Sequence, residues 1–105
     1  MTTSNEQAKP NAQILRALAM LEFLSSEPLR GLSNKDLVSA LNCAPPYVTR
    51  AADVLIEKGW VRKDDATGRF HITTHFSRMA LRVLDAFGRA ESDLATLKRN
   101  FTLTN

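Results

Sequence analysis

The sequence predicts a mainly α-helical fold with one small β-hairpin, followed by a long C-terminal helix. Three observations lead to this fold class. Apolar residues recur at helical spacing in several stretches, of which the last, over residues 76–101, is the longest. Two short β-like segments flank the turn sequence from Asp64 to Gly68. The length of 105 residues suits a single hydrophobic core.

The amino-acid composition narrows the class of protein further. Apolar residues make up 44% of the chain, which is typical of a globular protein, and the formal net charge of +3 permits a polyanionic partner without requiring one. Cys43 is the only cysteine, so no intramolecular disulfide can form and a reducing cytoplasm is expected. No apolar run approaches the ~18 residues of a membrane span, and no signal-peptide pattern opens the chain. We therefore expect a cytoplasmic protein with no membrane partner.

The first element is a helix that follows a polar leader. Residues 1–10 lack periodicity and end in Pro10, which predicts a disordered leader. From Asn11 to Ser25 the apolar residues predict a helix, and Glu27-Pro28 and Arg30-Gly31 end it. The stripe that we expect to face the core consists of Ile14, Leu15, Leu18, Leu21, Leu24 and the stem of Glu22.

A second, short helix begins after Ser33, a good N-cap, with Asp36 in the capping-box position. Its inner face is expected to hold Leu37, Ala40 and Leu41. Residues 42–44 form a tight connection, and the proline rule predicts that Ala44 and Pro45 are non-helical, while Pro46 fits a first helical turn.

The third helix is expected to run to about Lys58, where Gly59 stops it. Its predicted buried face is Val48, Ala51, Ala52, Leu55 and Ile56. Its predicted outer face is Tyr47, Thr49, Arg50, Asp53 and Glu57.

Residues 60–63 and 69–73 then form the hairpin. Two short helices joined by a tight turn and followed at once by a two-stranded wing are the arrangement of a winged helix-turn-helix, predicted here over residues 11–75. The major groove of B-DNA, about 12 Å wide, admits one helix whose outer residues meet base edges. The sequence therefore predicts binding to double-stranded DNA.

At this point the chain resembles a known family. The stretch from Leu15 to Leu84 looks like the DNA-binding domain of IclR-type transcriptional regulators. The matching runs are residues 14–24, Gly31-Leu32-Ser33, residues 36–41, Val48-Thr49-Arg50, residues 55–64 and Thr67-Gly68-Arg69-Phe70. The resemblance implies that Arg50 lies on the recognition helix and that the wing contacts the DNA backbone.

The sequence departs from the family in two places. The recognition helix of the family usually opens with a Pro-Lys-Ser-Thr-like sequence, and here the residues are Ala44-Pro45-Pro46-Tyr47. Operator preferences of the family are therefore not carried over. Those regulators also have a C-terminal effector-binding domain, which these 105 residues leave out, so the resemblance gives no ground to expect induction by a ligand.

Candidate DNA-binding residues lie on three elements. The N-terminus of the second helix favours a phosphate, although a cap without a ligand explains the same residues. Asp53 either accepts a hydrogen bond from cytosine or only orients Arg50. Tyr47 either contacts DNA or packs at the contact between the second and third helices. The alternative to a DNA-binding wing is an ordinary solvated hairpin, because Asp64 and Asp65 weaken the positive electrostatic potential there. The full predicted set is Ser33, Asn34, Lys35, Pro46, Tyr47, Thr49, Arg50, Asp53, Arg62, Lys63 and Arg69.

The C-terminal segment, residues 76–105, carries a heptad-like apolar seam. Its first half is expected to cover the core of the domain, and its second half to pair with another copy, because a lone amphipathic helix is marginal in water. A helix that folds back on its own monomer is the alternative. The predicted dimer interface consists of Val83, Phe87, Ala90, Leu94, Leu97 and Phe101.

Catalysis is not expected. His71 and His75 form no metal-ligand pattern with Cys43, and no phosphate loop or nucleophile with a matching base is recognisable, so we predict no enzyme, no cofactor and no metal. The predicted function is that of a homodimeric, sequence-specific regulator of transcription. Repression by occlusion is favoured over activation. A small regulator of a phage or a bacterial mobile element is a fitting context. The alternatives are a winged helix that binds a protein partner and a DNA-binding part of a replication, transposition or packaging machine.

Overall fold

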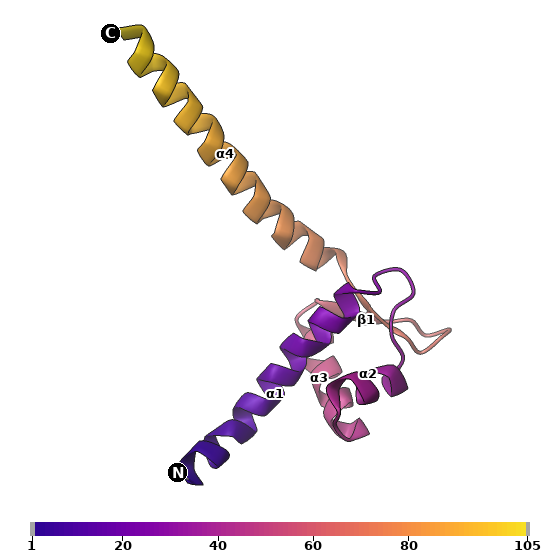
Figure 1. Cartoon of the computed structure of the whole chain (residues 1–105). Coiled ribbons are helices and arrows are strands. Elements are labelled where there is room, and N and C mark those ends of the chain that lie inside the picture. The colour runs from indigo at the N-terminus through magenta and orange to yellow at the C-terminus, as the bar shows by residue number, and fades with distance from the viewer. Residues whose placement is uncertain (1, 105) are drawn as a thin grey trace. The chain divides into compact units, whose positions relative to one another are not determined.

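The computed structural model describes residues 2–104, and their side chains over residues 11–103. The elements follow one another as α1 (Thr2–Ser25), α2 (Asn34–Leu41), α3 (Pro45–Glu57), β1 (Val61–Lys63), β2 (Phe70–Ile72) and α4 (Thr74–Thr104), as Figure 1 shows. The predicted order of helices, hairpin and long final helix is confirmed. The chain divides into two compact units, residues 1–74 and residues 75–105.

The N-terminal end of α1 differs from the sequence prediction. We expected a disordered leader over residues 1–10 and a helix from Asn11, whereas the helix runs back to Thr2. Glu6, Gln7, Ala8 and Lys9 are good helix formers, and a polar composition suits a solvated helix as well as a disordered leader. Met1 lies outside the described residues.

Local signals fix α2 and the turn after it. The Asp36 N–H donates to Ser33 Oγ at 3.1 Å, and the Ser33 N–H donates to Asp36 Oδ2 at 3.0 Å, so the predicted capping box is present. Asn42 then takes the left-handed conformation, with φ of 52°, and its N–H donates to the Val38 carbonyl. This residue ends α2 and turns the chain toward α3.

The start of α3 corrects one prediction. Pro45 was expected to be non-helical, but α3 begins there, and only Ala44 keeps the extended geometry, with φ of −70° and ψ of 150°. The restriction that a proline places on the preceding residue is a bias, and the fixed φ of Pro45 already suits a first helical position. The helix therefore starts one residue earlier than expected.

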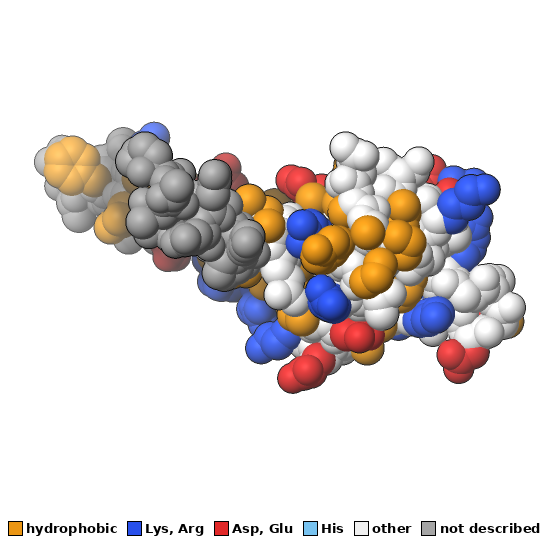
Figure 2. All heavy atoms as spheres, turned by 90° about the horizontal axis from the view of Figure 1, so that it is seen from below, with side chains coloured by type: hydrophobic (Ala, Val, Ile, Leu, Met, Phe, Trp, Pro, Cys, Tyr) orange, Lys and Arg blue, Asp and Glu red, His pale blue; other side chains and the backbone are white. Residues whose placement is uncertain are grey.

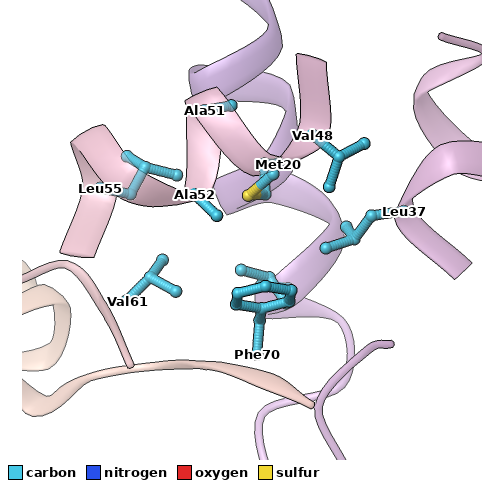
Figure 3. Packing of buried hydrophobic residues seen from close by; sticks show 9 residues of the cluster. Met20, Leu37, Val48, Ala51, Ala52, Leu55, Val61 and Phe70 are labelled. Carbon is cyan, nitrogen blue, oxygen red and sulfur yellow. The ribbon is translucent and has the colours of Figure 1, made fainter. Parts of the chain in front are cut away.

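The hydrophobic core lies between α1, α2, α3 and the hairpin, as Figure 3 shows. The buried face of α3 is as predicted except at Ile56, which is 39% exposed. Leu55 already points into the core, and the next helical residue is turned by about 100° away from it. The core consists of Met20, Leu24, Leu37, Val48, Ala51, Ala52, Leu55, Val61 and Phe70.

The hairpin is antiparallel, with Val61 opposite Ile72 and Lys63 opposite Phe70. The loop between α1 and α2 joins it, since Leu32 and Phe70 exchange two backbone hydrogen bonds of 3.0 and 2.8 Å. The preceding Gly31 is buried with φ of +71°, and a Cβ atom there would lie 2.6 Å from the Phe70 carbonyl oxygen. A glycine is therefore required for the wing to meet the entry to α2.

The second unit is the single helix α4. Its side chains from Leu81 to Leu103 are exposed, including large apolar ones such as Val83, Phe87 and Leu97. No helix in the part of the chain that the structure describes is both long and apolar enough to cross a lipid bilayer.

Candidate nucleic-acid interface

Helix α3 presents one face to the core and the opposite face to solvent. Val48, Ala51, Ala52 and Leu55 are buried. The predicted outer residues, Tyr47, Thr49, Arg50, Asp53 and Glu57, are all exposed, and so is Pro46. The Thr49 hydroxyl donates to the Pro45 carbonyl at 3.3 Å, which leaves its lone pairs toward solvent. The outer face therefore offers donors and acceptors of several kinds, as base-edge contacts require.

The start of this face is joined by a residue of α1 that sequence reasoning missed. The guanidinium carbon of Arg16 lies 4.2 Å from the centroid of the Tyr47 ring, and that of Arg50 lies 5.5 Å from the same centroid. Gln13, Arg16, Tyr47 and Arg50 line a pocket of about 160 Å³. The only sequence signal was that Arg16 is the sole cation within the otherwise apolar run of residues 14–21.

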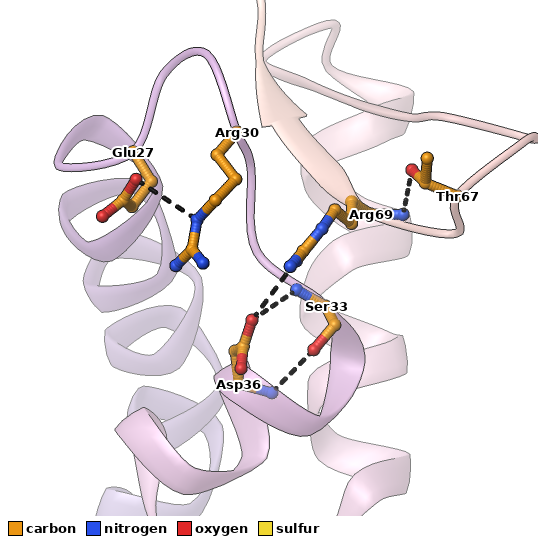
Figure 4. A network of polar contacts seen from close by, with 6 residues as sticks. All are labelled: Glu27, Arg30, Ser33, Asp36, Thr67 and Arg69. Atoms are coloured by element: carbon orange, nitrogen blue, oxygen red, sulfur yellow. Dashed lines mark hydrogen bonds and ion pairs between the residues drawn. The ribbon is translucent and has the colours of Figure 1, made fainter.

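The N-terminus of α2 and the wing meet through an ion pair, drawn in Figure 4. Arg69 Nη1 lies 3.6 Å from Asp36 Oδ2, the oxygen that also accepts the Ser33 N–H. The Ser33 hydrogen bonds, with Arg69 a smaller cause, lower the pKa of the Asp36 carboxyl below its usual value, so the carboxylate is charged at neutral pH. Arg69 is therefore turned toward α2, and it is held there by a residue absent from the predicted site.

The Ser33 hydroxyl accepts the cap hydrogen bond, so its proton stays available for a phosphate. Lys35 is exposed beside it, and Asn34 is half-buried. These residues sit at the positive end of the α2 dipole, where an anion is stabilised.

The wing carries two exposed cations on β1, Arg62 and Lys63, and the Lys63 Nζ atom lies 5.6 Å from the Phe70 ring centroid. The turn that follows is closed by its own polar groups. The Ala66 N–H donates to Asp64 Oδ1 at 2.9 Å, and this bond is the largest cause of a lowered pKa at Asp64. Asp64 is thus engaged in the turn, which leaves Arg62 and Lys63 as the solvent-facing charges of this strand.

An apolar groove lies beside the basic pocket, and Gln13 lines both. The groove has a volume of about 370 Å³ and is also lined by Ile14, Ala17, Leu18, Ala51 and Val54. Figure 2 shows one face of the molecule on which hydrophobic side chains gather, with Lys and Arg side chains at their edge.

The described residues contain no group of three or more His, Cys, Asp or Glu side chains placed to hold a metal ion. His71 is buried, and its ring, like the Phe70 carbonyl oxygen, packs against Gly31 so closely that a Cβ atom there would lie 2.6 Å away. His71 is therefore a packing residue in this fold.

Comparison with known proteins agrees with this geometry. A family model described as the IclR helix-turn-helix domain matches residues 13–65, which is half of the chain and runs from α1 to the turn after β1. Comparisons with curated proteins and with solved structures gave no match. The chain belongs to the IclR helix-turn-helix family of DNA-binding transcription regulators.

Proposed function

We propose that this protein binds specific sequences of double-stranded DNA as a homodimer, with α3 in the major groove and the wing on the phosphate backbone or in the adjacent minor groove. The observation that carries the proposal is the outer face of α3, where Tyr47, Thr49, Arg50 and Asp53 are exposed opposite a buried inner face. A helix anchored by one face and polar on the other fits a groove that admits one helix.

Each element has a distinct task in this proposal. Thr49, Arg50 and Asp53 meet base edges, since Arg pairs with guanine and a carboxylate accepts from cytosine. Arg62 and Lys63 on β1, and Ser33 and Lys35 at the start of α2, contact phosphates, which fix the register of the protein without reading sequence. Asn34, Pro46 and Arg69 complete the proposed set of DNA-contacting residues.

The proposal of a homodimer is based on α4. Its apolar side chains at residues 83, 87, 90, 94, 97 and 101 recur in steps of three and four, and all of them are exposed in the single chain. A seam with this spacing is buried when two helices pair. Two paired copies present two recognition helices, which selects a two-fold-related site with half-sites about 34 Å apart.

A DNA-binding dimer can repress by covering a promoter, so we propose repression as the mode of regulation. Because a DNA-binding protein must reach the DNA, we also propose that the protein lies in the cytoplasm, at the nucleoid if the cell is bacterial.

Arg50→Ala tests the assigned docking face. Loss of a bidentate contact to guanine is expected to weaken binding to a selected operator by about 1–3 kcal/mol, with a smaller loss on random duplex. Fluorescence anisotropy measures both affinities, with Arg89→Ala on α4 as the charge-matched control. If Arg50→Ala binds both duplexes as the unmodified protein does, while its circular dichroism is unchanged, α3 does not dock as proposed.

The alternative function, a winged helix that binds a protein partner, has one observation in its favour. The apolar groove between α1 and α3 holds exposed Ile14 and Leu18 next to the proposed docking face. That function requires no affinity for DNA, so DNA binding itself separates the two.

A further inference from the structure

The pocket between α1 and the start of α3 has the character of an anion site. Four side chains line it, and all of them are polar or charged: Gln13 and Arg16 from α1, and Tyr47 and Arg50 from α3. Its volume of about 160 Å³ is several times the ~30 Å³ that one water molecule occupies in the liquid. A tetrahedral oxyanion with bound water therefore fits.

The Tyr47 ring organises the two cations. Arg16 and Arg50 both approach this ring, at 4.2 and 5.5 Å from its centroid. A guanidinium that lies over an aromatic face keeps its N–H donors at its planar edge, where they can bind a phosphate oxygen. The stacking thus restrains both side chains before a ligand arrives, which lowers the entropy lost on binding.

The charge of the pocket is uncompensated. Arg30 and Arg69 each have a carboxylate partner, Glu27 at 3.5 Å and Asp36 at 3.6 Å. For Arg16 and Arg50, no ion pair with an Asp or Glu is recorded among residues 11–103, whose side chains the structure describes. Two cations that share one ring repel each other, and an anion between them removes that repulsion.

The backbone at this end of α3 cannot replace these side chains. Helix N-termini commonly bind phosphate through free N–H groups, but Pro45 and Pro46 have none. The Tyr47 N–H is engaged as well, because it donates to the Ala44 carbonyl at 3.0 Å. An anion at the start of α3 must therefore be bound by Arg16, Arg50 and their neighbours.

We propose that the pocket of Gln13, Arg16, Tyr47 and Arg50 binds one phosphate of the DNA backbone. The inference rests on the proposed function and extends the DNA interface to α1. Arg16, the Tyr47 hydroxyl and the Gln13 amide donate to the phosphate oxygens, and Arg50, whose guanidinium has five N–H donors, offers the phosphate those that do not pair with guanine. The contact carries no sequence information, and it fixes where the first turn of α3 enters the groove.

Arg16→Gln tests this site through the salt dependence of binding. One lost phosphate contact on B-DNA is expected to reduce the slope of log affinity against log salt by about 0.9, and to weaken binding about tenfold near 0.1 M salt, equally on operator and random duplex. Arg89→Gln removes the same charge from α4 and is expected to change neither slope nor affinity by a comparable amount. Arg16→Lys keeps the charge and is expected to retain the slope, with weaker binding because the stacked geometry is lost.

A duplex with one uncharged methylphosphonate locates the contact. When the substitution is moved along the backbone, one position is expected to weaken the unmodified protein about tenfold and to have no further effect on Arg16→Gln. If the unmodified protein binds DNA with a steep salt dependence, and Arg16→Gln has the same slope and affinity, the pocket holds no phosphate and the proposed function stands. If the unmodified protein shows no salt-dependent binding, both proposals are wrong. Urea denaturation of Arg16→Gln shows whether a loss of binding is a loss of fold.

Discussion

Gly31→Ala is expected to lower the free energy of unfolding of the first unit by about 3 kcal/mol, through two causes that add. Gly31 has φ of +71°, where an L side chain is strained. Its Cβ atom would also lie 2.6 Å from the Phe70 carbonyl oxygen and 2.6 Å from His71 Cε1. The first of these contacts is to backbone, so relief requires the loop to move away from β2, which breaks the Leu32–Phe70 hydrogen bonds.

Two other glycines serve as matched controls for this result. Gly59 and Gly68 have φ of +83° and +76°, but a Cβ atom at either would meet nothing within 4 Å. Alanine at these positions is expected to cost about 1 kcal/mol, from backbone strain alone. Urea midpoints of the three variants give the comparison, and equal losses at Gly31 and Gly59 would mean that the close approach to β2 is not the cause.

Leu94→Glu is expected to abolish the dimer and to weaken binding to a two-half-site operator on the order of 100-fold. A charge at the centre of the α4 seam would be buried without a partner, and a monomer loses the gain from binding both half-sites at once. Sedimentation equilibrium measures the first effect and anisotropy the second.

Thr96→Glu introduces the same charge on the same helix, two residues away and so on the opposite face. This variant is expected to remain dimeric. An unmodified protein that is already monomeric at tens of micromolar would rule out α4 as the dimer interface.

Elements that depend on neighbouring residues could be predicted from the sequence. The Ser33 capping box, the tight connection over residues 42–44 and the hairpin around Gly68 each follow from side chains within a few residues. The buried face of α3 followed from its spacing, apart from Ile56.

Which side of α1 faces the core could not be predicted in the same way. The expected stripe contained Ile14, Leu15 and Leu18, which are exposed, and omitted Met20, which is fully buried. A helix with apolar residues around much of its circumference does not say which side meets α3, because that choice is made by tertiary packing.

The candidate site shows the same division. The exposed positions on α3 follow from helical spacing, but the stacking of Arg16 on Tyr47 joins residues far apart in the chain. The ion pair of Arg69 with Asp36 likewise depends on how the wing packs on α2. Long-range contacts of this kind leave no periodic signal in one sequence.

The most direct test of DNA binding is an anisotropy titration of the unmodified protein against a mixed-sequence duplex at about 50 and about 200 mM salt. The exposed cations of α2, α3 and the wing predict measurable binding at low salt that weakens at least tenfold at the higher salt, as for two or more phosphate contacts. No binding even at low salt would contradict the account, and would favour the protein-binding alternative.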